Sequence, residues 1–436
     1  MTKVAFHTLG CKLNFAETSS IARKFTDNGY KRVDFNENAD IYIINTCSVT
    51  KKADKKSEQF IKKARKQNPD AQIVVMGCYA QLQSGKIASI EGVDLILGSN
   101  EKFRVMDYLK EGKKNSQPEI HSCNIEDTTA YYPSFSYGDR TRSFLKVQDG
   151  CDYHCSYCTI PLARGNSRNQ SIESIVSEAE EIGQTNVKEI ILTGVNIGDF
   201  GKTTGESFMD LIKALDQVEG IERIRISSIE PNLLSNEIID FVKYSEKILP
   251  HFHIPLQSGC NAVLAQMRRR YNRELFRDRV NYIRQEIPDA FIGVDVIVGF
   301  PGEDEEKFNE TYEFLEKLDA SFYHVFSYSK RPNTPAAEMR NQIPKQIITQ
   351  RSKELQELAE KKERAFYKKN LDSIRPVLFE NYQKDNQMFG FTDNYIKIET
   401  PYNPKLTEQI AQVKLKSINN KGNVAVDTLQ NKTIEE

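Results

Sequence analysis

The sequence is short of several features that would each assign the protein to a special class. It has 60 basic and 61 acidic residues, so its net charge of −1 predicts no chain-wide affinity for polyanions. No apolar run reaches the roughly 18 residues that a membrane span needs, and the first residues lack the order of a secretory signal. Internal repeats and low-complexity tracts are also missing. We therefore expect a cytosolic globular protein with no membrane partner, in which any nucleic-acid surface is a local patch.

The 436 residues are enough for two or three domains, and the first part alternates apolar and polar segments. Strands alternating with helices predict a doubly wound α/β domain with a parallel sheet. We expect this domain to span residues 1–112 and a polar linker to follow at 113–140. The apolar runs that predict its strands are residues 4–9, 40–45, 72–76 and 93–97.

A second alternating series begins after the predicted linker. Its six apolar runs, separated by helical patterns, predict a partial (β/α)6 barrel over residues 141–370. Barrels of this kind carry their chemistry on the loops after the carboxyl ends of the strands. Short β-rich runs with turn residues between them predict a small all-β domain over residues 371–436. The six barrel runs are residues 144–147, 189–193, 223–229, 251–256, 291–300 and 323–329.

Three of the eight cysteines lie close together, directly after the first predicted barrel strand. Cys151, Cys155 and Cys158 have a spacing that can ligate three irons of a [4Fe–4S] cube. In a reducing compartment, clustered cysteines bind metal or do chemistry more often than they form disulfides. No fourth cysteine is near in sequence, so the fourth iron would keep the open position that is typical of catalytic sites. The alternatives are a fortuitous cluster or a zinc knuckle, for which His154 is poorly placed as a fourth ligand.

Three further cysteines come together only when the predicted strands are considered. Cys11, Cys47 and Cys78 each end an apolar run of the first domain. The carboxyl ends of parallel strands share one edge of the sheet, where doubly wound folds bind ligands. A second three-cysteine cluster site is therefore predicted at this edge, with ordinary core cysteines as the alternative. Cys123 and Cys260 fit neither group, and we expect them to be bystanders.

The spacing CxxxCxxC, with the aromatic residue Tyr157 before the last cysteine, resembles the signature of the radical S-adenosylmethionine (SAM) superfamily. Together with the N-terminal cysteines and a C-terminal domain of TRAM type, it resembles the radical SAM methylthiotransferase family over nearly the whole chain. Several stretches resemble the branch of the family that acts on threonylcarbamoyladenosine in tRNA. The isopentenyladenosine branch usually has Gln-Met-Asn after the first cysteine, and the ribosomal-protein branch has Lys-Asn. The stretches that favour the threonylcarbamoyladenosine branch are residues 7–14, 45–50, 52–54, 192–198 and 225–231.

The resemblance implies two [4Fe–4S] clusters, one at each cysteine triad, and SAM. One SAM would methylate a sulfur on the auxiliary cluster at the N-terminal triad, and a second would give a 5′-deoxyadenosyl radical at the barrel cluster. The implied product carries a methylthio group on C2 of N6-threonylcarbamoyladenosine, next to the anticodon. A radical suits this reaction because the C2–H bond is unactivated, so cofactor chemistry dominates and no catalytic side chain beyond the cluster ligands is predicted.

The implied partners are tRNA and an electron donor of the flavodoxin or ferredoxin type. The nearer alternatives are the same chemistry on isopentenyladenosine tRNA or on a ribosomal-protein side chain. The remote alternative is a non-catalytic iron–sulfur sensor that binds RNA.

Polar residues and glycines follow the later barrel strands, where the resemblance places SAM. Carboxylate and amide groups suit ribose hydroxyls, which need an acceptor and a donor together. An ordinary loop or core position is the alternative for each of them. The predicted SAM residues are Tyr157, Gly194, Asn196, Ser228, Glu230, Gln257 and Ser258, with Val296, Ile297 and Val298 packing the adenine.

Two basic stretches, residues 51–66 and the arginine-rich residues 268–279, are candidates for phosphate contacts, which need lysine and arginine. Residues 51–66 carry eight basic and two acidic side chains, and a solvated helix face is the alternative. The charge of the C-terminal domain is nearly balanced, so its RNA contacts would depend on shape and on aromatic residues such as Phe389, Phe391 and Tyr395. The predicted RNA-binding residues are Lys51, Lys52, Lys55, Lys56, Lys62, Lys63, Arg268 and Arg269.

Overall fold

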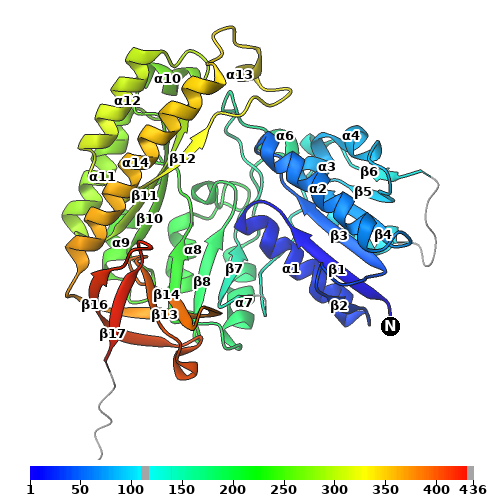
Figure 1. The fold of residues 1–436 in the computed structure, drawn as a ribbon, viewed down its shortest axis with the longest axis horizontal. Helices are drawn as coiled ribbons and strands as arrows, with labels where there is room; N and C mark the ends of the chain where they lie inside the picture. Colours follow the sequence, from blue (N-terminus) through cyan, green and yellow to red (C-terminus); the bar gives the residue numbers. More distant parts are fainter. Residues whose placement is uncertain (110–116, 139, 430–436) are drawn as a thin grey trace, which may run out of the picture.

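The computed structural model describes residues 1–109, 117–138 and 140–429. Figure 1 shows the N-terminal domain on one side, the larger α/β barrel on the other, and the C-terminal β domain below the barrel. Within the described residues, no helix is long and apolar enough to cross a membrane. The predicted boundary between residues 112 and 113 lies outside the described residues.

The N-terminal domain has a six-stranded parallel sheet in the order β2-β1-β3-β4-β5-β6. Helix α1 covers one face, while α2, α3 and α4 cover the other, so the predicted doubly wound sheet is confirmed. The strands are β1 (Lys3–Thr8), β2 (Lys31–Val33), β3 (Ile41–Thr46), β4 (Gln72–Gly77), β5 (Leu95–Leu97) and β6 (Glu119–His121). The helices are α1 (Lys12–Asp27), α2 (Lys51–Gln67), α3 (Cys78–Leu82), α4 (Ser84–Ala88) and α5 (Val105–Tyr108).

Part of the predicted linker belongs to the folded domains. Strand β6 pairs with β5 and lies within residues 113–140. Further along, the carbonyl of Phe135 accepts a hydrogen bond from Arg23 at 2.9 Å, and Phe135 forms a β-bridge with Leu145 of the barrel. The edge strands β2 and β6 have three residues each, too few for an apolar period to be visible in the sequence.

The barrel has six parallel strands, as predicted, in two sheets of sequential order, β7-β8-β9 and β10-β11-β12. Two parallel bridges, Ile224 to Ile248 and Ser228 to His253, connect the two sheets. The strands are β7 (Arg142–Lys146), β8 (Glu189–Thr193), β9 (Arg223–Ile226), β10 (His251–Gln257), β11 (Phe291–Val298) and β12 (Phe322–Ser327). The helices are α6 (Ile160–Arg164), α7 (Ile172–Gly183), α8 (Phe208–Asp216), α9 (Asn236–Tyr244), α10 (Asn261–Gln266), α11 (Arg273–Glu286), α12 (Glu305–Lys317), α13 (Pro335–Glu338) and α14 (Lys345–Asn370).

Alternate residues of the barrel strands face opposite sides. On β11, Val294, Val296 and Val298 are buried in the core shared with the outer helices. Asp295 and Ile297 point to the other side, into the lumen, where they line a cavity. Helix α1 of the first domain packs beside β7, with the rings of Phe15 and Phe144 at 5.7 Å. The lumen is therefore bordered by both domains.

The C-terminal domain is a closed five-stranded β-barrel in the order β13-β14-β15-β17-β16. It docks at the amino ends of the α/β-barrel strands, where Arg223 donates to the carbonyl of Thr392 at 3.0 Å. Tyr395 stacks on Phe391 and lies under Arg225, so these two aromatic residues serve the domain contact and not a free RNA surface as expected. The strands are β13 (Ile374–Lys384), β14 (Gln387–Thr392), β15 (Lys397–Pro401), β16 (Ile410–Ile418) and β17 (Val424–Thr428).

Candidate cluster sites and the cavity between them

The barrel triad, Cys151, Cys155 and Cys158, lies on the loop after β7. The backbone N–H groups of Tyr153 and Ile160 donate to the Sγ atoms of Cys151 and Cys158, both at 3.4 Å. Burial raises the pKa of both thiols to about 12. All three cysteines are free of disulfides. Donors aimed at sulfur stabilise metal-bound thiolates, so these residues fit an iron–sulfur cluster.

Arg269 contacts the barrel triad, and this position corrects the prediction that Arg269 contacts RNA. Its guanidinium donates to Cys155 Sγ at 3.1 Å and forms an ion pair with Glu230, and only 4% of its side chain is exposed. Arg268 has a φ of 58°, and this turn leaves Arg268 exposed while Arg269 points inward. A run of three arginines carries no signal for which of them is buried.

The predicted SAM residues on the second and third strand ends surround the same loop. A side chain at Gly194 would lie 2.9 Å from the carbonyl oxygen of Gln148, so the backbone approaches closely there. Asn196 is buried and its Oδ1 has no partner among the described residues. Burial raises the pKa of Glu230. Glu230 forms an ion pair with Arg269, which also donates to Cys155. An orphaned acceptor and a buried carboxyl fit a polar ligand such as SAM. Ser228 is half-buried and pairs with His253 through the backbone.

The remaining predicted SAM residues lie at the fourth and fifth strand ends, and only some of them face the cavity. Gln257 and Ile297 line the cavity beside Tyr157. Ser258 is fully buried and shares a 3.2 Å hydrogen bond with Thr311 of α12, so it faces away from the cavity. Val296 and Val298 are also turned away because strand residues alternate between faces. The predictions that Ser258, Val296 and Val298 contact SAM are therefore wrong, because their side chains face away from the cavity.

The auxiliary triad gathers at the carboxyl edge of the N-terminal sheet. Cys11 precedes α1, Cys47 follows β3, and Cys78 begins α3 after β4. A Cβ atom at Gly10 would lie 2.7 Å from Cys47 Cβ, and Gly10 has a φ of 108°, so glycine permits this approach. Burial and the neighbouring Cys78 thiol raise the pKa of Cys47 to about 12. The three thiols therefore interact, as a shared cluster site requires.

A buried network of charged side chains joins the two domains beside the auxiliary triad. Arg164 donates to Glu17 at 3.0 Å and to Asp149 at 2.8 Å, and it reaches Asn14 at 2.6 Å. Although burial alone would raise it, the charge of Arg164 helps to hold the pKa of Glu17 at about 2. Burial raises the pKa of Cys47, and the charge of Arg164 opposes part of this rise. This opposing effect favours a bound thiolate. The members of the network are Glu17, Lys102, Lys146, Asp149, Arg164 and Arg168.

A cavity of about 270 Å³ lies beside the barrel triad, and Cys158 is part of its lining. Val49 and Thr50, the second and third residues after Cys47, line another part of it. Asp295 and Ile297 of the barrel lumen also line it. One cysteine of the barrel triad and the segment that follows Cys47 of the auxiliary triad therefore share one space, which no motif in the sequence revealed.

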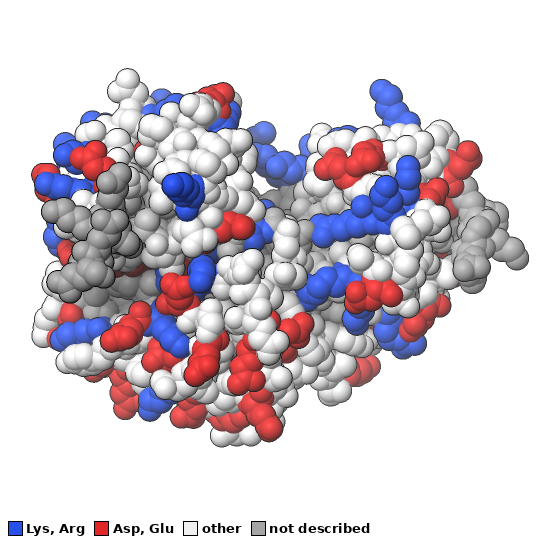
Figure 2. All heavy atoms as spheres, turned by 90° about the horizontal axis from the view of Figure 1, so that it is seen from below, with Lys and Arg blue, Asp and Glu red and all other residues white. Residues whose placement is uncertain are grey.

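The six predicted RNA-binding lysines of α2 are exposed, and the opposite face of the helix packs on the sheet through Ile61 and Ala64. The helix begins beside the cavity, where the Lys51 backbone donates to Ser329 of the barrel at 3.2 Å. Figure 2 shows a run of Lys and Arg side chains on the half that belongs to the N-terminal domain. Both the exposure and the location fit a phosphate-contacting surface.

Comparison with known proteins supports the same division of the chain. Residues 3–98 match the uncharacterized protein family UPF0004, and residues 145–315 match the radical SAM superfamily. A threonylcarbamoyladenosine tRNA methylthiotransferase, MtaB, of Bacillus subtilis is 42% identical over 425 residues, 95% of this chain and 94% of its own length. MtaB of Aquifex aeolicus is 40% identical over 91% of this chain and 96% of its own length.

More distant similarities agree in fold. A tRNA-2-methylthio-N(6)-dimethylallyladenosine synthase of Clostridium tetani is 34% identical over 88% of this chain and 87% of its own length. The radical SAM methyltransferase TsrM of Kitasatospora setae, at 13% identity, superposes with a TM-score of 0.55 over 77% of each chain. The fold and its two cysteine sites define a radical SAM protein. The identities over nearly full length assign the chain to the radical SAM methylthiotransferase family.

Proposed function

We propose that this chain is a tRNA methylthiotransferase that adds a methylthio group to C2 of N6-threonylcarbamoyladenosine next to the anticodon. The observation that carries the proposal is the cavity lined by Cys158 of the barrel triad and by Val49 and Thr50, which follow Cys47 of the auxiliary triad. A reaction that both activates a carbon and delivers sulfur needs two reactive centres at one substrate atom. The names of the relatives that are 40% and 42% identical support the substrate.

Each triad would hold one [4Fe–4S] cluster, and SAM would bind at the barrel cluster. When bound, these groups supply the radical and sulfur-transfer chemistry that side chains cannot provide at an unactivated C–H bond. The chain itself supplies thiolates, N–H donors to sulfur and a cavity lined by Cys158 and by the segment that follows Cys47. Arg269 holds Glu230 at the edge of the barrel triad, where a carboxylate can accept from ribose hydroxyls.

The exposed lysines of α2 would contact the tRNA backbone beside the cavity. An electron donor of the flavodoxin or ferredoxin type would reduce the barrel cluster. We place this reaction in the cytosol, where its tRNA substrate occurs.

Mass spectrometry of tRNA nucleosides tests the proposal in a host that lacks this modification and expresses the chain. We expect 2-methylthio-N6-threonylcarbamoyladenosine with the intact chain and none with Cys155→Ala. A rise of a different methylthio nucleoside would preserve the chemistry and refute the substrate. No change in any methylthio nucleoside would refute the RNA assignment.

A further inference from the structure

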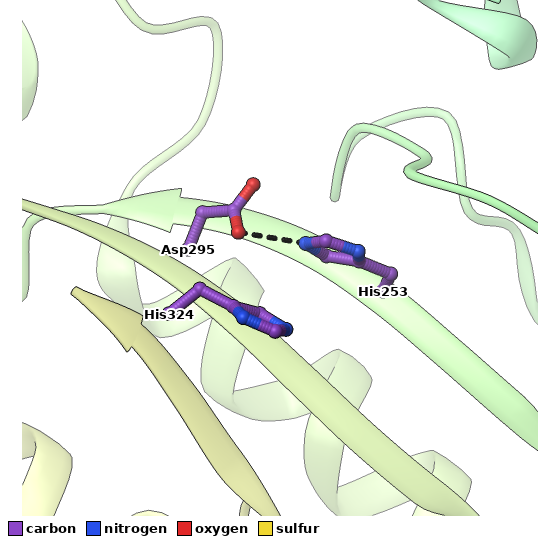
Figure 3. Close-up of side chains that lie close together, drawn as sticks. All are labelled: His253, Asp295 and His324. Atoms are coloured by element: carbon purple, nitrogen blue, oxygen red, sulfur yellow. Dashed lines mark hydrogen bonds and ion pairs between the residues drawn. The ribbon is translucent and has the colours of Figure 1, made fainter. Parts of the chain in front are cut away.

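Three polar side chains meet in the barrel lumen, each from a different strand. His253 lies on β10, Asp295 on β11 and His324 on β12, and Figure 3 shows their side chains together. The His253 Nε2 and Asp295 Oδ1 atoms are 2.7 Å apart, and the two imidazole rings are stacked with centroids at 4.9 Å. Asp295 and His324 are direct partners in the β11–β12 pairing, so the strand register creates this cluster.

The lumen cluster, His253, Asp295 and His324, adjoins the cavity that Cys158 lines. Asp295 belongs to both, and Gln257 lies beside it in the cavity lining. Within the described part of the chain, the His324 ring forms no hydrogen bond, although the ring is partly buried. Polar groups in such positions are usually paired, so an unused donor and acceptor beside a cavity point to a ligand.

The Asp295 carboxylate and the two imidazoles could hold a metal ion, but the charge of a nearby lysine favours an organic, anionic group instead. Burial, with the charge of His253, lowers the pKa of His324 to about 4, so the ring is neutral at neutral pH. The charge of Lys12, from the start of α1, also acts on His324. No carboxylate forms an ion pair with Lys12 among the described residues. A lysine without a close counter-ion disfavours a bound cation and attracts a carboxylate.

We infer that the lumen cluster recognises the N6 substituent of the substrate adenosine by hydrogen bonding. This inference rests on the proposed function. The threonylcarbamoyl group carries a carboxylate, a hydroxyl and a carbamoyl N–H, and the cluster offers acceptors and donors for them. With the base in the cavity beside Cys158, its substituent can extend past Asp295 into the lumen. An isopentenyl group would leave these polar side chains unpaired, and sites of that kind reject the apolar analogue strongly.

The test compares two histidine-to-phenylalanine variants of the iron-loaded protein. His324→Phe keeps an aromatic ring of similar size and removes both ring nitrogens. His121→Phe is the matched control, because His121 stacks on Tyr108 in the N-terminal domain, away from the cavity. The readouts are equilibrium binding, without SAM, of anticodon stem-loops that carry threonylcarbamoyladenosine, isopentenyladenosine or plain adenosine, and kcat/KM for each.

We expect the wild type and His121→Phe to prefer the threonylcarbamoyl stem-loop. In His324→Phe and Asp295→Asn, its binding and kcat/KM should fall by about tenfold or more, with little change for plain adenosine. Iron content and the SAM dissociation constant, measured on the same samples, check that both cluster sites remain intact.

Each other outcome has a distinct meaning. If both lumen variants keep the full preference for threonylcarbamoyladenosine, the inference is overturned while the proposed function stands. If the wild type modifies only another nucleoside, the proposed function fails first. If one equivalent of zinc co-purifies with the wild type, is lost in His324→Phe, and substrate preference is unchanged, the cluster is a metal site and the inference is wrong.

Discussion

The two cysteine triads perform related tasks but are built in opposite ways. The barrel triad occupies eight consecutive residues, 151–158, on one loop, and its backbone N–H donors, Tyr153 and Ile160, lie within this segment or two residues after it. The auxiliary triad takes one cysteine from each of three strand ends, at positions 11, 47 and 78. Its charged surroundings come from both domains through Arg164. A local site is defined by spacing, whereas the convergent site depends on the whole sheet and on the domain interface.

The largest expected effect separates the roles of the triads. Cys155→Ala should abolish 5′-deoxyadenosine formation and product, because the variant lacks one iron ligand of the SAM-binding site. Cys47→Ala should retain some SAM cleavage but give no methylthio product. Liquid chromatography with mass spectrometry measures both compounds in one reaction.

Cys260→Ala serves as the control for both variants, because Cys260 is buried in an apolar cluster that contains neither triad. It should keep both activities. Normal methylthio product from either triad variant would end the division of labour proposed for them.

The second prediction concerns the charged network at the domain interface beside the auxiliary triad. Arg164→Leu leaves Glu17 and Asp149 buried without their shared cation, and breaking such a pair costs about 3–5 kcal/mol. The midpoint of urea unfolding should fall, and iron should leave the auxiliary site before it leaves the barrel site. Iron analysis and electron paramagnetic resonance measure the two sites.

Arg351→Leu is a matched control, because Arg351 of α14 forms a buried ion pair with Glu303 in the loop before α12. It should also lower stability but leave iron at the auxiliary site. Equal loss of auxiliary iron in the two variants would show that general destabilisation, not the network, empties that site.

The third prediction affects the barrel triad alone. Arg269→Lys keeps a positive charge but cannot donate to Cys155 and Glu230 at once with a planar fork. We expect SAM affinity to fall by about tenfold, the equivalent of about 1.4 kcal/mol, while auxiliary iron is unchanged. Isothermal titration with SAM measures this effect, and unchanged affinity would remove Arg269 from the SAM site.

The smallest effect is expected at the lysine-rich face of α2. Replacing Lys51, Lys52, Lys55 and Lys56 by Gln should weaken tRNA binding without altering the preference among modified nucleosides. The slope of log affinity against log salt should fall by about 0.9 for each phosphate that the variant no longer neutralises. The matching control replaces the exposed Lys353 and Lys361 of α14, where no change is expected. A salt slope equal to that of wild type would show that α2 is only a solvated face.

Features that depend on local spacing and periodicity could be predicted from the sequence. Features that depend on the packing of distant segments could not. Both triads, the six barrel strands and the exposed lysines of α2 followed from spacing and periodicity. The buried direction of Arg269 did not, because three successive arginines look alike until a positive φ at Arg268 turns the chain. Nor did the network around Arg164, whose partners lie up to 150 residues away. The lumen cluster escaped because its members meet only through the β10–β11–β12 register.

The central claim is that both triads act on one carbon in one cavity. It is tested most directly with an anticodon stem-loop whose threonylcarbamoyladenosine carries deuterium at C2, mixed with iron-loaded protein, SAM and reductant. The account predicts deuterium in 5′-deoxyadenosine from the wild type and from Cys47→Ala, with methylthio product from the wild type alone. Methylthio product without deuterium in 5′-deoxyadenosine would contradict it.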